Sequence, residues 1–418
     1  MSTLRDDAMS IIHESIKAVL PDAAVARALN NKEITTDVVL VAIGKASWNM
    51  AKAAKETLGS KVKRGIVITK YHHSGGPIES CDIIEAGHPL PDKNSVLGAT
   101  KVLEMVSRLT PDDHVVFLIS GGGSSLFEKP LDGVSLEDIT DLTNQLLGCG
   151  ADIVEMNTIR KHLSAVKGGR FAQQCNGAKI YTVVLSDVVG DKLDAIASGP
   201  ASPDGTTSAD ALQILKKYNI PVGNHLVEAL GKETPKTIEN CETVVTGNVA
   251  ALCQAAAKSA EKFGYSSIML STSVDCEAKE MGRILASKVK ELKTGVNSEF
   301  SPKPPCAIIY GGETVVRLTG NGKGGRNQEV ALAAALGIEG IEDVVVFSFG
   351  SDGTDGPTDA AGGMVDGLTS ARIRAGSIVP QESLANNDSY HALKVSGDLI
   401  VTGPTGTNVN DLMVVLCK

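Results

Sequence analysis

A lysine follows a glycine at the predicted end of a strand. The β-branched run Val38–Ile43 leads to Gly44 and Lys45, and residues 46–58 have the spacing of an amphipathic helix. A lysine in a first helical turn opposes the helix dipole, so an anionic ligand explains Lys45 better than helix stability does. A solvated lysine without a ligand is the competing interpretation.

A turn of serines and glycines follows the apolar run 115–119. It consists of Ser120, Gly121, Gly122, Gly123, Ser124 and Ser125. Consecutive backbone N–H groups without obstructing Cβ atoms suit a phosphate or a carboxylate. The chain contains neither the Walker motif GxxxxGK[ST] nor GxSxG, so a nucleophilic role for Ser124 has no support. We expect an anion cradle here, with a flexible glycine turn as the alternative.

Cations are concentrated in residues 157–170, where Arg160, Lys161, Lys167 and Arg170 precede or flank a Gly-Gly pair. Such a run is more often a solvated helix face. In an acidic protein it is also a candidate contribution to an anion site.

Aspartates follow two further predicted strands. Asp187 comes just after the run 180–185, where a carboxylate is placed to accept a proton or to reach Mg²⁺, or simply to cap a turn. Asp352, Asp355 and Asp359 lie on a glycine-bent loop after the run 344–349. Their spacing excludes an EF-hand and favours handling of a Mg²⁺–nucleotide complex over a Ca²⁺ site.

A second glycine-rich loop, residues 320–325, formally matches GxGxxG and precedes Arg326. A lone match of this kind is weak, and its preceding strand, predicted over 314–318, lies in a hairpin-like run rather than at the head of a βαβ unit. We interpret it as an anion-binding loop in which Arg326 forks onto phosphate or carboxylate oxygens. Residues 402–411, which include Thr405 and Asn408, form another strand-end loop suited to phosphate contacts.

The elements that position these residues predict an α/β protein. Apolar runs separated by helical segments are typical of strands buried in a parallel sheet, so we expect a doubly wound, three-layer first domain, residues 1–235, with a helical connector at 206–235. The second domain, residues 236–418, is expected to be smaller, with a mixed sheet, because its strands are too close for crossover helices. Its predicted strands are 243–246, 268–270, 307–310, 314–318, 344–349 and 399–402.

Composition excludes several classes of protein. With 418 residues, net charge −9 and 3% aromatic residues, the chain is long enough for two or three cores and poorly suited to nucleic acid. The eight cysteines are scattered without zinc spacing, which indicates free thiols in a reducing cytoplasm. Residues 1–20 predict an amphipathic helix rather than a signal peptide, and no apolar run is long enough to span a membrane. The sequence leaves a homo-oligomer open.

Taken together, the motifs resemble the glycerate 2-kinase family, whose carboxy-terminal part is the MOFRL domain, here about residues 306–412. The motifs that carry the resemblance are VAIGK at 41–45, SGGGSS at 120–125, RKHLS at 160–164, SD at 186–187, GGRNQE at 324–329, DGTDG at 352–356 and GPTGTN at 403–408. The resemblance implies a Rossmann-like first domain, a smaller α/β second domain and an active cleft between them. It also implies ATP- and Mg²⁺-dependent phosphorylation of D-glycerate to 2-phosphoglycerate.

Lys45, Asp187 and Arg326 match the family's proposed catalytic positions. We further expect residues 120–125, Lys161, Thr405 and Asn408 to contact the nucleotide, and Asp352 and Asp355 to hold the metal. An NAD(P)H-dependent hydroxypyruvate reductase and a non-catalytic sugar-acid or nucleotide sensor are the alternatives. The reductase is disfavoured because no acidic residue follows the GxGxxG loop at the end of a second strand.

Overall fold

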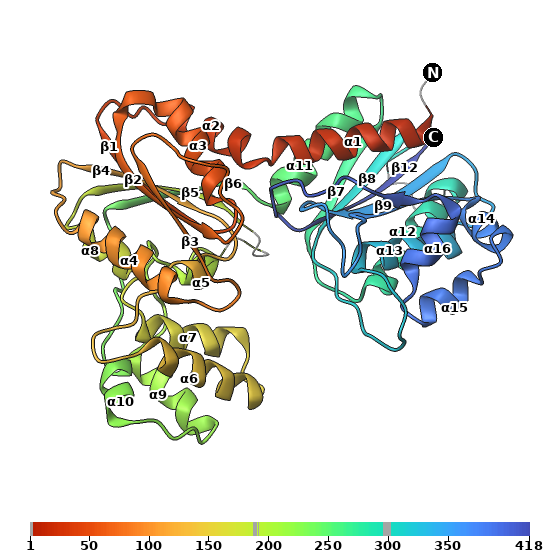
Figure 1. The fold of residues 1–418 in the computed structure, drawn as a ribbon. Helices are drawn as coiled ribbons and strands as arrows, with labels where there is room; N and C mark the ends of the chain where they lie inside the picture. Colours follow the sequence, from red (N-terminus) through yellow and green to blue (C-terminus); the bar gives the residue numbers. More distant parts are fainter. Residues whose placement is uncertain (1–2, 187–189, 191, 296–301) are drawn as a thin grey trace. The chain divides into compact units, whose positions relative to one another are not determined.

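The computed structural model describes residues 3–186, 190, 192–295 and 302–418. The chain forms two compact units, one of residues Pro21–Thr246 and one of residues Met1–Leu20 together with Gly247–Lys418. Each unit is built on its own six-stranded sheet (Figure 1). In the described part of the chain, no helix is long and apolar enough to cross a membrane.

The first sheet has the strand order β3-β2-β1-β4-β5-β6, and the pairs among its first five strands are parallel. Its strands are β1 Val38–Ile43, β2 Val62–Lys70, β3 Cys81–Ala86, β4 His114–Ile119, β5 Lys179–Leu185 and β6 Cys241–Gly247. Because the order runs outward in both directions from β1, the carboxyl ends of β1 and β4 are neighbours where the strand order reverses. Ligands bind at such switch points in open α/β sheets.

Two hydrophobic cores cover the two faces of this sheet. Along β1, Val39, Val41 and Ile43 belong to one core, while Val38, Leu40 and Ala42 belong to the other. The alternation places a helical layer on each face, which confirms the predicted three-layer α/β architecture. The covering helices are α2 Pro21–Asn30, α3 Ser47–Leu58, α4 Lys93–Val106 and α8 Arg170–Gln174, with the short η1 Gly59–Lys61 and α5 Gly123–Leu126 near strand ends.

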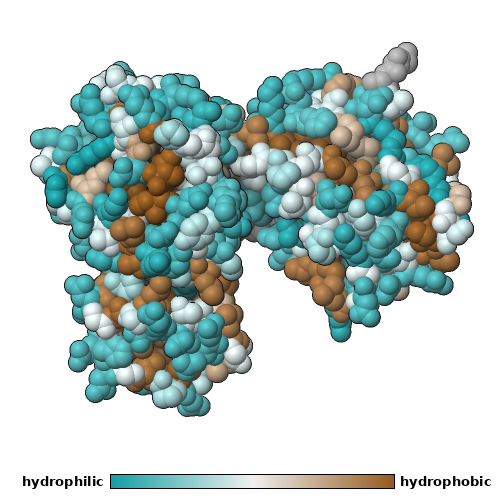
Figure 2. Space-filling model, in the orientation of Figure 1, coloured by the Kyte–Doolittle hydropathy of each residue, from teal (hydrophilic) through white to brown (hydrophobic). Residues whose placement is uncertain are grey.

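A separate helical layer in the same unit has its own small core, which joins residues of α6, α7, α9 and α10. Its helices are α6 Leu136–Gly148, α7 Ile153–Leu163, α9 Ser208–Lys217 and α10 Asn224–Leu230, and η2 Ile196–Ser198 follows β5. The predicted helical connector at 206–235 is thus the second half of this layer. Its visible face carries hydrophobic as well as hydrophilic residues (Figure 2).

The second sheet has the order β11-β10-β9-β12-β8-β7, in which only the pair β7–β8 is parallel, and so the predicted mixed sheet is confirmed. Its strands are β7 Ser266–Val274, β8 Cys306–Gly312, β9 Val344–Gly350, β10 Gly362–Asp366, β11 Leu399–Ile400 and β12 Asp411–Cys417. Helices α1 Leu4–Ala18 and α11 Val249–Lys262 contribute to the core on one face, and α12 Ala278–Thr294 and α13 Arg326–Gly337 to the core on the other. The remaining helices are α14 Thr369–Ala375, α15 Pro380–Ala385 and α16 Ser389–Ser396.

Helix α1 departs from the expected domain division at residue 235, because it packs on the second sheet and not on the first. The hydroxyl group of Tyr265 donates to the buried Asp7 at 2.6 Å, and Arg5 donates to Asp366 and Asp398 at 2.6 and 2.7 Å. At the other end of the division, β6 belongs to the first sheet although residues 243–246 were assigned to the second domain. A division by sequence order alone therefore assigns helix α1 and strand β6 to the wrong units.

One predicted strand is wrong and four strands were not predicted. Residues 314–318 contain only an isolated bridge between Val315 and Glu277, so the expected hairpin after β8 does not form. Strand β12, at the carboxyl end of the chain, pairs instead with both β8 and β9. The unpredicted strands are β2, β3, β10 and β12.

Candidate functional site

Lys45 lies in the turn between β1 and α3, two residues before the helix begins at Ser47. Its backbone is held at several points: the N–H group donates to the carbonyl of Gly121 at 2.9 Å, and its carbonyl accepts from Thr69 and His73 at 3.4 and 3.2 Å. Among the described residues, no carboxylate or other acceptor contacts the half-buried Lys45 ammonium group. The backbone of Lys45 is thus held by hydrogen bonds, while its side-chain charge has no ion-pair partner among the described residues.

The glycines at this switch point are required by close backbone approach. Gly44 has φ +117°, and a Cβ atom there would collide with the backbone carbonyl of Ser120. The hydroxyl oxygen of Ser120 accepts from the Ala46 N–H at 3.0 Å, which joins the turns after β1 and β4. Ser120 therefore supports the site from behind rather than facing an incoming anion.

The loop 120–125 keeps free donors. Within the described chain, the backbone N–H groups of Gly121 and Gly122 donate to no protein acceptor. Gly122, at φ +85°, lies beside Lys45 and His88, because a Cβ atom there would be 3.2 Å from Lys45 Cγ and 2.9 Å from His88 Cδ2. N–H groups without a protein acceptor, beside a lysine without an ion-pair partner among the described residues, form an environment suited to an anion.

His88 is a residue of this site that the sequence analysis missed. Burial, and then the nearby positive charges of Lys45, Lys70 and His73, lower the pKa of His88. It is therefore neutral at pH 7 and offers a hydrogen bond without a charge. Its position after β3 was a usable signal, since β3 is in the row of parallel strands that ends at this edge.

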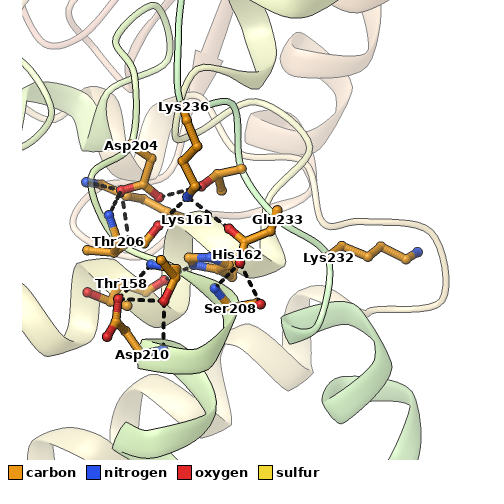
Figure 3. Close-up of polar contacts among 12 residues, drawn as sticks. Thr158, Lys161, His162, Asp204, Thr206, Ser208, Asp210, Lys232, Glu233 and Lys236 are labelled. Carbon is orange, nitrogen blue, oxygen red and sulfur yellow. Dashed lines mark hydrogen bonds and ion pairs between the residues drawn. The ribbon is translucent and has the colours of Figure 1, made fainter.

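Most cationic side chains of the segment 157–170 are buried and bond to other groups of the protein. The Lys167 ammonium group and Glu128 form a fully buried ion pair at 2.5 Å, and the Arg170 guanidinium group donates to backbone carbonyls, among them that of Ser164 at 2.6 Å. Lys161, predicted to contact the nucleotide, is buried and lies 3.3 Å from both Asp204 and Asp194 (Figure 3 shows its Asp204 side). Lys161, Lys167 and Arg170 therefore do not form a solvated helix face, whereas the Arg160 side chain has no hydrogen-bond or ion-pair partner among the described residues.

Lys161 is connected to the loop 120–125 only through intermediate residues. Ser124 hydrogen-bonds Ser198 at 2.9 Å through their hydroxyl groups, and Gly199 packs against Asp194, which pairs with Lys161. Its predicted role in nucleotide binding therefore stays a prediction, with its ammonium group already shared by two carboxylates.

Arg326, in the other unit, begins α13 and is held by two carboxylates. Its Nε and Nη2 atoms donate to Asp411 at 2.6 and 3.0 Å, and Nη1 donates to Glu313 at 2.8 Å. Burial alone lowers the pKa of Arg326, but the hydrogen bonds and charge of Asp411, and the charge of Glu313, outweigh it, so the net shift is upward. These three bonds use three of five guanidinium donors and fix the plane in which the remaining two point. The sequence analysis included Asp411 only as the last residue of the loop 402–411, and Glu313 was not a candidate.

Residues 320–323 of the loop 320–325 are not open to an anion, because their N–H groups bond to the protein. Thr319 and Gly320 donate to the Asn387 side chain at 2.7 and 3.0 Å, and Gly322 donates to the Asn386 carbonyl at 2.9 Å. The N–H groups of Gly324 and Gly325 have no acceptor among the described residues. Residues 386–389 fill the space where Cβ atoms at Gly320, Gly322 and Gly324 would lie. These three glycines admit another protein segment, so Gly320 and Gly322 do not support a dinucleotide fingerprint. An anion-binding role for the end of the loop, next to Arg326, stays a prediction.

The aspartates of the loop after β9 have structural partners. Both carboxylate oxygens of buried Asp355 accept backbone N–H groups at the start of α13, from Asn327 at 3.1 Å and Gln328 at 2.9 Å. Burial raises the pKa of Asp355 to about 6. Asp352 accepts from the Thr354 N–H at 2.9 Å, and Asp359 accepts from the Tyr390 hydroxyl at 2.7 Å.

These contacts bear on the predicted metal site. Among the residues described, no group of three or more His, Cys, Asp and Glu side chains could hold a metal ion. Asp355 is committed to the helix terminus, whereas Asp352 is half-buried and keeps one oxygen without a donor from the described residues. The pair does not fit a metal site made of protein ligands alone.

The last predicted loop packs against the same region. Thr405 donates its hydroxyl to the Ser351 carbonyl at 2.6 Å and its N–H to the Asp352 carbonyl at 3.1 Å, while Asn408 is half-buried three residues further on. Arg326, Asp352, Asp355 and Thr405 thus gather at one edge of the second sheet, and Lys45 and the loop 120–125 gather at one edge of the first. Asp187 lies outside the described residues.

Comparison with known proteins gives consistent matches over the whole chain. A domain of unknown function, DUF4147, matches residues 7–231, and the MOFRL family matches residues 306–411. The chain is 54% identical over 415 residues to a D-glycerate 2-kinase of Thermotoga maritima, covering 99% of this chain and 98% of that protein. It is 41% identical over 436 residues to a glycerate 2-kinase of Pyrococcus horikoshii, covering 99% and 97%.

A crystal structure of glycerate kinase from Thermotoga maritima matches with a TM-score of 0.97 at 54% identity, over 99% of each chain. A putative hydroxypyruvate reductase of Agrobacterium vitis is 41% identical over 385 residues, covering 90% of this chain and 86% of that protein.

Proposed function

The chain belongs to the glycerate 2-kinase family, and we propose that it transfers a phosphoryl group from ATP to the 2-hydroxyl group of D-glycerate, giving 2-phosphoglycerate. The observation that carries the proposal is the switch point of the first sheet, where Lys45 is next to Gly121 and Gly122, whose N–H groups have no acceptor among the described residues. Phosphoryl transfer depends mainly on positioning and on charge stabilisation, and these groups supply both.

Each unit contributes one cation to the proposed chemistry. Lys45 and Arg326 stabilise the glycerate carboxylate and the transferring phosphoryl oxygens. Arg326 suits this role because Asp411 and Glu313 fix its guanidinium plane and leave two donors for substrate oxygens. The proposal requires both cations to act on the same pair of substrates.

The remaining assignments follow the family positions. Asp187 orients or deprotonates the 2-hydroxyl group of glycerate, or contacts Mg²⁺. The loop 120–125 cradles a phosphate of ATP, with further nucleotide contacts from Lys161, Thr405 and Asn408.

Mg²⁺ enters the proposal as the complex of ATP, since Mg²⁺ in kinases is held largely by phosphates and water with one or two carboxylates. Asp352 is the better placed of the two predicted ligands because Asp355 caps α13. When bound, the ion would neutralise phosphate charge.

The free state of all eight cysteines supports a reducing compartment, and we place the enzyme in the cytoplasm.

A coupled assay for ADP release tests the activity. We expect release that requires D-glycerate and Mg²⁺ together, and ³¹P and ¹H NMR of the product to place the phosphate on carbon 2. Release without glycerate, or a product phosphorylated on carbon 3, contradicts the proposal.

Hydroxypyruvate reduction is the second candidate, because the putative reductase of Agrobacterium vitis is also similar to this chain. The filled loop 320–325 argues against it, since that loop has no free N–H groups for a dinucleotide pyrophosphate at Gly320 or Gly322. NADH oxidation with hydroxypyruvate, in the absence of ATP, would favour the reductase.

A further inference from the structure

Three consecutive residues in the first unit adopt left-handed backbone conformations. Ala197 has φ 51°, Ser198 has φ 60° and Gly199 has φ 64°. Only the glycine adopts this conformation without steric conflict, because a Cβ atom in the left-handed region approaches the backbone carbonyl. A strained turn of this kind persists only where its surroundings determine it, and such turns cluster at functional sites.

The surroundings of this turn are well defined. The carbonyl groups of Ser198 and Gly199 accept the N–H groups of Gly168 and Gly169 at 3.0 and 2.7 Å. Ala197 packs against Gly123, where an added Cβ atom would lie 2.7 Å from that of Ala197. The turn is therefore fixed from the segment 168–169 on one side and touches the loop 120–125 on the other.

The hydroxyl group of Ser198 makes a direct contact with that loop. Ser198 is fully buried, and its Oγ atom lies 2.9 Å from the Oγ atom of Ser124. The strain places this hydroxyl group where an ordinary right-handed turn would not. The contact holds the Ser124 side chain, two residues beyond Gly122, whose N–H group has no acceptor among the described residues.

We propose that Ser198 is a positioning residue for the anion cradle: through Ser124 it holds the loop 120–125 in the conformation that receives a phosphate of ATP. This rests on the proposed function, which assigns that loop to the nucleotide. Ser198 itself touches no substrate, since it is buried behind Ser124. Its removal therefore weakens nucleotide binding and leaves the chemical step nearly unchanged.

The experiment compares Ser198→Ala, Ser198→Gly, Ser124→Ala and the double alanine variant. We expect each single variant to raise KM for ATP about fivefold to tenfold, as for one lost hydrogen bond, with kcat and KM for D-glycerate within about twofold. Because both residues act through one contact, KM for ATP of the double variant should be no higher than that of either single variant. Titration calorimetry with ATP gives the same comparison without turnover.

Ser198→Gly separates the hydroxyl group from the strain, because glycine adopts the left-handed conformation freely and protects against a folding defect. Ser370→Ala is the matched control: Ser370 is a buried serine of the other unit whose hydroxyl donates to the Ala335 carbonyl at 3.2 Å. It should leave KM for ATP unchanged.

Two results overturn the inference: a KM and Kd for ATP within twofold of the parent in folded Ser198→Ala and Ser198→Gly, or additive effects of the two serine changes. Either differs from failure of the proposed function, in which the unmodified enzyme releases no ADP with D-glycerate.

Discussion

The two glycine-rich loops of this protein, residues 120–125 and residues 320–325, make different contacts with the rest of the chain. In the loop 120–125 the glycines let two strand-end turns meet and leave N–H groups of Gly121 and Gly122 unbonded among the described residues. In the loop 320–325 the glycines admit residues 386–389, which satisfy N–H groups with the side chains and carbonyls of the protein itself. Glycine indicates close approach, and whether a ligand or the chain makes that approach depends on the tertiary fold.

Two lysines give the strongest test of this difference: Lys45, which lies next to the first loop, and Lys323, which lies within the second. Lys45→Met should lower kcat/KM by about 10²–10³, by analogy with about 2.7–4 kcal/mol for a lost transition-state donor, because its ammonium group is free to act on substrate. Steady-state kinetics measures the loss. The control is Lys323→Met in the second loop, where Nζ lies 4.6 Å from the centre of the Tyr390 ring. A threefold change or less is expected there, and equal losses in both variants would erase the distinction between the loops.

The second loop should respond in stability instead. Asn387→Gly removes the side chain that accepts from Thr319 and Gly320 and donates to Glu329 at 3.0 Å, and glycine suits the φ of 55° at this position. Losing these buried bonds should cost about 2–3 kcal/mol of unfolding free energy. Urea denaturation measures this, with calorimetric binding of ATP expected to stay as in the parent. An unchanged midpoint would show that the loop does not depend on Asn387.

The pH dependence of stability sharpens the assignment of Asp355 as a helix cap near the second loop. Its folded pKa of about 6 is above the ordinary value of 3.8, so the folded state holds the proton more tightly. Stability from this group is present below pH 4 and is lost as the pH rises through 6. Asp355→Asn should remove this loss, on the order of 2 kcal/mol between pH 4 and 7. Parallel unfolding curves for both proteins over that range would contradict the prediction.

The smallest expected effect concerns the strained turn that supports the first loop. Ala197→Gly relieves one left-handed non-glycine residue, and it should raise the unfolding free energy by up to about 1 kcal/mol, since a more flexible unfolded chain offsets part of the gain. Thermal unfolding measures it. Ala211→Gly is the contrasting control: Ala211 is buried within α9, so glycine there should destabilise. A lower Tm for Ala197→Gly would show that the turn is not strained.

Much of the architecture was predictable because it depends on local pattern. The continuous apolar run Val38–Ile43 and the runs near β4, β5, β8 and β9 identified strands, and the glycines after them identified the edges where polar groups gather. The strand expected at 314–318 was wrong because a short apolar run pairs only if a partner strand lies beside it. Strand β12, about a hundred residues later in the chain, pairs with β8 at the position that the expected hairpin strand would have taken.

The sequence by itself determined the α/β class, the strand-end positions of Lys45 and the loop 120–125, and the family. Only the tertiary structure decided which charges and N–H groups remain available. Lys161 meets Asp204, Arg326 meets Asp411, and the loop 320–325 meets residues 386–389, all across tens of residues of sequence. The physical reason is that the sequence shows where a charge or an N–H group is, but not which partner it has. The free energy of burying that group depends on the partner that the fold brings to it.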